Sequence, residues 1–143
     1  YLSQLKAEQL LPTLQADELL ITADTVVLLD GQILGKPHDL DDARRMLHRL
    51  SGRQHEVVSG VSLSTIDWQI SFSSHTLVTF AQLTDSEIDH YVARYQPLDK
   101  AGAYGIQEWI GYIGVSHIEG SFYNVMGLPV HRLYRVLQDA DLF

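Results

Sequence analysis

Cysteine is absent from this chain of 143 residues, and proline and tryptophan are scarce, with four and two residues. The absence of cysteine excludes disulfides, thiolate metal sites and thiol nucleophiles, and it suits a reducing cytosol. Long apolar runs are missing as well, since runs such as 18–23 are far shorter than the roughly 20 residues of a membrane span. We therefore expect a cytoplasmic protein that does not associate with membranes.

Positive charge is in short supply, with 10 Lys and Arg against 18 Asp and Glu, which gives a formal net charge of −8. A surface of that sign repels nucleic acid and anionic lipid. An RNA-binding module that stacks bases on Trp68, Trp109 and the tyrosines is therefore disfavoured. Any phosphate-bearing ligand must be small, and it must meet locally clustered lysines or a metal ion.

Several familiar site patterns are also missing. The glycines match neither the dinucleotide-binding pattern G-x-G-x-x-G nor the P-loop pattern G-x-x-x-x-G-K-[ST]. The seven histidines include no H-x₃-H pair, which argues against a zinc site. Ser59 and Ser121 lack the surroundings of a nucleophile elbow, which argues against a serine hydrolase.

The length and the 45% hydrophobic content fit one globular domain over residues 1–143. Predicted strands and helices alternate, and Asp30-Gly31 is a strong hairpin turn. This order predicts an α/β fold with mixed α+β character, whose central sheet is mixed and partly antiparallel and is flanked by helices.

Apolar spacing and capping signals predict the individual elements. Helices are expected from Leu2 until Pro12 or shortly after it, over 40–50 after the N-cap Asp39, after the capping box that Thr84 and Glu87 form, and after Pro129. Separate strands are expected over 19–23 and 26–29, a hairpin over 57–66 and 69–83, and a further strand over 109–118.

Asp24 interrupts what otherwise reads as a buried strand, and a charge there needs a partner. We predict that it lies where a strand ends and the chain turns, the usual place for ligand groups in open α/β sheets. Flanked by Thr22 and Thr25, its carboxylate suits Mg²⁺ or a role as proton acceptor. Taken alone, Asp24 is better explained as the cap of a turn, and two nearby lysine turns reverse that balance.

Lys36 stands between Gly35 and Pro37, which fix the backbone while the ammonium stays free to reach a phosphate. Lys100 precedes a run of small residues, Ala-Gly-Ala, that lets a ligand approach closely. Gln107 can offer a donor and an acceptor together, as the edge of a nucleobase requires. Each residue by itself is more simply read as a solvated surface residue.

Six collinear blocks resemble those of the Maf family of nucleoside triphosphate pyrophosphatases, whose fold is similar to that of inosine triphosphate pyrophosphatases. The blocks cover nearly the whole chain and lie at Lys6-Ala7, 23–27 (ADTVV), 35–37 (GKP), 50–57 (LSG followed by His55 and Val57), 99–107 (DKAGAYGIQ) and 120–129 (GSFYNVMGLP).

This resemblance implies attack of water on the α–β phosphoanhydride, which yields a nucleoside monophosphate and pyrophosphate. Asp24 would accept the proton and hold the divalent ion, Mg²⁺ or alternatively Mn²⁺. The substrate-binding residues would be Lys6, Thr25, Lys36, Asp99, Lys100 and Gln107. The intact 99–107 block resembles the branch acting on dTTP and UTP, with Thr25 and Gln107 implicated in the choice of base.

One departure from the family concerns its opening segment, in which a Ser and paired arginines bind phosphate and an acidic residue helps to hold metal. This segment does not precede Tyr1, and we expect the natural protein to begin earlier; with Tyr1 as the start, little turnover is expected. A non-catalytic nucleotide-binding regulator of cell division is the alternative function. Because related proteins often pair, we expect a homodimer.

Overall fold

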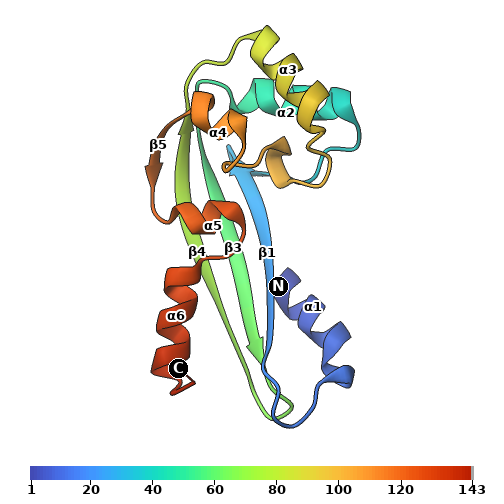
Figure 1. Ribbon diagram of the computed structural model, residues 1–143, viewed down its shortest axis with the longest axis vertical. Helices are drawn as coiled ribbons and strands as arrows, with labels where there is room; N and C mark the ends of the chain where they lie inside the picture. The colour runs from blue at the N-terminus through green and yellow to red at the C-terminus, as the bar shows by residue number, and fades with distance from the viewer. Residues whose placement is uncertain (143) are drawn as a thin grey trace.

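The computed structural model describes residues 1–142, and a five-stranded sheet lies at the centre of that part of the chain (Figure 1). The strand order is β2-β1-β3-β4-β5, and each of the four neighbouring pairs is antiparallel. The strands are β1 (Leu20–Leu29), β2 (Gln32–Leu34), β3 (Gln54–Ser64), β4 (Gln69–Phe80) and β5 (Val115–Glu119).

Helices surround this sheet and cover both of its faces (Figure 1). They are α1 (Leu2–Leu10), α2 (Leu40–Leu50), α3 (Asp85–Tyr95), α4 (Trp109–Gly114), α5 (Phe122–Met126) and α6 (Val130–Asp139), with short 3₁₀ turns η1 (Leu11–Thr13) and η2 (Ala101–Ala103). None of the helices in residues 1–142 combines the length and apolar character that crossing a bilayer requires.

The two faces of β3 differ in character because successive side chains of a strand point to opposite sides. Val61 and Leu63 are fully buried against Leu133 of α6. The alternate positions face α1 and carry small residues: the hydroxyl of Ser62 is 2.9 Å from that of Ser3, and a Cβ on Gly60 would lie 3.6 Å from the Ser3 hydroxyl. Small side chains thus let α1 approach the sheet closely.

The main hydrophobic core lies at the other end of the sheet, where α2, α3 and α4 meet β1, β3 and β4 (Figure 1). Leu47 of α2, Val92 of α3 and Phe80 of β4 are among its buried members. The expected caps hold these helices in place. Asp39 accepts the backbone N–H of Asp42, and Thr84 and Glu87 form the complete capping box.

The fold class is confirmed, and three of the expected details are wrong. The sheet pairs are all antiparallel, not mixed. The segments 19–23 and 26–29 form one strand, β1, because pairing with β3 continues through Asp24, opposite Gly60. The segment 109–118 is a strand only from Val115, because the turn of α4 buries Ile110 completely in the main core.

Candidate functional site

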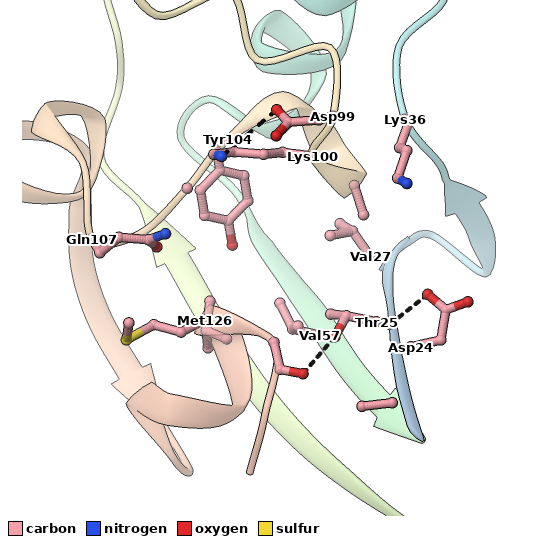
Figure 2. A pocket seen from close by; sticks show the side chains of 15 residues that line it. Asp24, Thr25, Val27, Lys36, Val57, Asp99, Lys100, Tyr104, Gln107 and Met126 are labelled. Atoms are coloured by element: carbon pink, nitrogen blue, oxygen red, sulfur yellow. Dashed lines mark hydrogen bonds and ion pairs between the residues drawn. The ribbon is translucent and has the colours of Figure 1, made fainter. Parts of the chain in front are cut away.

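A cavity of about 300 Å³ lies between the middle of β1, the loop that contains η2, and the end of α5 (Figure 2). Charged and polar side chains share its lining with apolar ones. The lining residues are Ala23, Asp24, Thr25, Val27, Lys36, Val57, Asp99, Lys100, Ala101, Tyr104, Gly105, Gln107, Val125, Met126 and Gly127.

Gly102 joins the two lysine-bearing loops. Its N–H donates to the carbonyl of Gly35 at 3.1 Å, which ties the 99–107 loop to the turn that carries Lys36. Its φ is +69°, and a Cβ there would lie 3.0 Å from Cγ2 of Val27 in β1. Only glycine combines this backbone conformation with so close an approach. Lys36 and Lys100, 64 positions apart in sequence, therefore line one cavity.

The Lys100 side chain lies along its own loop. A Cβ on Gly105 would stand 2.8 Å from Cε of Lys100, so the absence of a side chain at 105 makes room for the methylene chain. The ammonium lies 3.7 Å from Oδ1 of the exposed Asp99. The Gly105 N–H donates to the Tyr91 hydroxyl, which itself donates to Glu108. Burial raises the pKa of Tyr91, so this hydroxyl keeps its proton and the loop stays anchored.

Asp24 lies in the middle of β1, not at a strand end. It is paired with Gly60, on the face that α1 covers, whereas Thr25 is paired with Ser59 and points to the opposite face. Oδ1 of Asp24 accepts the Thr25 N–H at 2.8 Å, and Oδ2 is 3.7 Å from Nζ of Lys6. With 29% of its side chain exposed, the carboxylate is not sealed in apolar packing.

The strand edge explains how Asp24 reaches the cavity from the other face of the sheet. In residues 1–142, β2 pairs with β1 only over 27–29, so the edge beside Asp24 is open. The carboxylate borders both the cavity and a second one of about 250 Å³ beside the start of α1, and it stands on the same side of the view as Lys36 (Figure 2).

A buried hydrogen-bond chain fixes the α5 wall of the cavity. The side-chain amide of Asn124 is completely buried, and its two N–H hydrogens are shared among three acceptors within 3.2 Å of Nδ2: the carbonyls of Val57 and Ser74 and the hydroxyl of Thr76. The backbone carbonyl of Asn124 accepts a hydrogen bond from the hydroxyl of Ser59, which lies 2.8 Å from the hydroxyl of Thr25. Thr25 also donates to the carbonyl of Gly127 at 3.3 Å. These hydrogen bonds from β1, β3 and β4 therefore fix the position of α5.

His55 of β3 holds one of the cavity-lining residues in place. Its Nε2 is 2.6 Å from the hydroxyl of Tyr104, a cavity-lining residue, and the two rings meet edge to face. Burial lowers the pKa of His55 to about 4, so the imidazole is neutral at pH 7. Burial raises the pKa of Tyr104, which keeps its hydroxyl protonated. The pair thus links β3 to the 99–107 loop without a charge.

Six of the seven predicted site residues line the cavity, namely Asp24, Thr25, Lys36, Asp99, Lys100 and Gln107. Lys6 does not; it lies beyond the edge of β1 and donates to the carbonyl of Ala23 at 3.0 Å. Sequence reasoning gave no role to Met126 or Asn124. The only sequence signal for either was its place in the block 120–129.

Asp24 is also the residue that fits a divalent ion. No group of three or more histidine and acidic side chains in residues 1–142 gathers closely enough to hold a metal ion by itself. One carboxylate suffices for Mg²⁺ when waters and substrate phosphates supply the remaining oxygen ligands. The partly exposed Asp24, facing the lysines, is consistent with that kind of shared site.

The chain is similar to known proteins over nearly its whole length. The sequence model described as Maf-like protein matches residues 1–140. A dTTP/UTP pyrophosphatase from Phocaeicola vulgatus is 59% identical over 138 residues, which cover 96% of this chain and 72% of the relative. One of the same name from Porphyromonas gingivalis is 60% identical over 142 residues, or 97% of this chain and 71% of the relative. One of the same name from Bacteroides thetaiotaomicron is 55% identical over 138 residues, which cover 96% of this chain and 72% of the relative.

Replacing Asn124 with Ala should destabilise the fold. The change leaves the buried carbonyls of Val57 and Ser74 without their amide donor, and the expected loss in the free energy of unfolding is about 3 kcal/mol. Urea denaturation measures it, with Gln9→Ala on the exposed side of α1 as the matched control, expected to change stability by less than about 0.5 kcal/mol. Equal stabilities of the two variants would contradict the role given to Asn124.

His55 should make stability fall as the medium becomes acidic. Unfolded His55 binds a proton near pH 6.5 and folded His55 only near 4, so between these values the unfolded state holds more protons and the free energy of unfolding decreases. At pH 5 the loss relative to pH 7 should be about 2 kcal/mol from this residue. His55→Gln should remove that part of the pH dependence in urea denaturation, whereas His131→Gln on α6 should leave it unchanged.

Proposed function

This chain belongs to the Maf-like protein family, and on that premise we propose that it is a nucleoside triphosphate pyrophosphatase that acts on dTTP and UTP. It would hydrolyse the α–β phosphoanhydride to a nucleoside monophosphate and pyrophosphate and so remove triphosphates, including modified pyrimidine ones, from the nucleotide pool. The observation that carries the proposal is the convergence of Lys36, Lys100 and Asp24 on one cavity.

The charges support binding of a triphosphate in this cavity. The chain as a whole carries a net charge of −8, so a polyanion is attracted only where cations gather. Lys36 and Lys100 come from two loops that the bond between Gly102 and Gly35 joins. Lys6 stands 3.7 Å from Asp24 on the far side of that edge, where it can add a third ammonium.

Asp24 is the proposed proton acceptor. Its Oδ1 is held by the Thr25 N–H, which orients the carboxylate, while Oδ2 faces Lys6 and remains partly exposed to water. A positioned carboxylate of this kind takes the proton of an attacking water molecule. A divalent ion bound beside Asp24 would neutralise charge on the phosphate oxygens. Positioning and charge neutralisation carry most of the rate in phosphoryl transfer, so no covalent nucleophile is needed.

Gln107 is the proposed contact of the nucleobase. It lies on the opposite side of the cavity from Asp24 and Lys36 (Figure 2). Its exposed amide offers a donor and an acceptor, which match the hydrogen-bonding edge of a pyrimidine. Thr25 forms part of the floor between the two ends. A cytoplasmic location and a homodimer remain predictions that accompany this function.

A panel of triphosphates tests the function directly. With Mg²⁺, the purified full-length natural protein should release pyrophosphate from dTTP and UTP faster than from ATP, GTP or CTP, and excess EDTA should stop the release because the phosphates then lose a neutralising ion. Pyrophosphate is measured by a coupled assay, and Mn²⁺ is added back in a parallel series. Absence of release from every nucleotide would rule the proposal out.

Replacing Asp24 with Asn should lower kcat for dTTP by about a hundredfold or more, because the amide cannot accept the proton. Asp17→Asn, an exposed acid that does not line the cavity, is the matched control and should keep full activity. If Asp24→Asn retains wild-type turnover, Asp24 is not the proton acceptor. If hydrolysis is lost while a cell-division phenotype persists, the regulatory alternative gains support.

A further inference from the structure

Met126 is a large apolar side chain that borders the cavity and is still 45% exposed. It lies on the same side of the cavity as Gln107, opposite Asp24 and Lys36 (Figure 2). The side chain therefore stands at the end that the proposed function assigns to the base. Nothing in the proposed hydrolysis requires an exposed thioether at this place.

The surroundings of Met126 match one edge of a pyrimidine. Such a ring has a hydrogen-bonding edge, formed by O2, N3 and O4, and an apolar edge, formed by C5 and C6. Gln107 can serve the first edge. Met126, together with Val57 and Val125 in the lining, offers an apolar surface for the second.

The backbone of Met126 is fixed, whereas its side chain is adaptable. Asn124, two residues before it, is bonded to β3 and β4, and the carbonyl of Gly127, one residue after it, accepts a hydrogen bond from Thr25. The methionine side chain has three rotatable bonds and a polarisable sulfur, which let it fit surfaces of different shape. A fixed backbone with an adaptable side chain suits a site that takes a pyrimidine ring both with and without a methyl group.

We propose that Met126 is a specificity-determining residue that contacts the C5 edge of the pyrimidine and favours a 5-methyl group there. This inference rests on the proposed function and names a residue of that same site. It makes the base choice of the protein depend on α5 as well as on the 99–107 loop.

Four triphosphates separate the methyl group from the sugar: dTTP and dUTP differ only in the 5-methyl group, as do 5-methyl-UTP and UTP. In the wild type, the methylated member of each pair should have the higher kcat/KM, by about twofold for a half-buried methyl group and up to about fourfold for a fully buried one. Met126→Ala should bring both ratios close to one, whereas Met126→Leu should keep most of the preference. The effect of the 2′-hydroxyl, read from dUTP against UTP, should not change.

Tyr123→Ala is the matched control, because Tyr123 lies on the same helix, is 55% exposed and does not line the cavity. It should leave both methyl ratios at their wild-type values. A general loss of stability lowers the four kcat/KM values together and leaves the ratios intact. If the wild type hydrolyses all four nucleotides and Met126→Ala keeps both ratios, the inference about Met126 is wrong and the proposed function stands. If the wild type hydrolyses none of them, both fail.

Discussion

The contact between Gly102 and Val27 is the constraint on which the cavity depends. A Cβ at position 102 would lie only 3.0 Å from a methyl of Val27, so a side chain there would push the loop away from β1, and the same residue donates its N–H to Gly35. These two interactions place a long loop and a short turn against one strand. The positions of Lys36 and Lys100 follow from that packing, and Gln107 and Met126 lie on the side of the cavity opposite Asp24 and Lys36 (Figure 2).

The alternation of side chains along β1 organises the chemistry of the site. Thr25 and Val27 form the floor on one face of the sheet, while Asp24 reaches the cavity from the other face around an open strand edge. This arrangement keeps the carboxylate beside the cations and away from the apolar lining that Val57 and Val125 provide. The polar part of a ligand can therefore contact Asp24 while its less polar part contacts Thr25 and Val27 on the other face of the same strand.

Local signals in the sequence predicted what local interactions decide. The caps at Asp39 and Thr84 are bonds between residues three apart, and both are present. The single strand through Asp24 and the helix at 109–114 were not foreseen, because pairing with Gly60 and burial of Ile110 are tertiary effects. Turns and loops in the sequence singled out four cavity-lining residues, and the family resemblance added Thr25 and Asp99. Met126 and Asn124 were missed, because their roles arise only when α5 docks on the sheet.

The Lys6 ammonium has a consequence beyond its proximity to Asp24. It donates a hydrogen bond to the carbonyl of Ala23, an acceptor on the open edge of β1 where, in residues 1–142, no strand is paired. Unpaired edges recruit strands of other molecules, and a lysine placed on such an edge opposes that association because its charge would have to be desolvated. The same ammonium that stands beside the carboxylate therefore also opposes self-association through this open edge of β1.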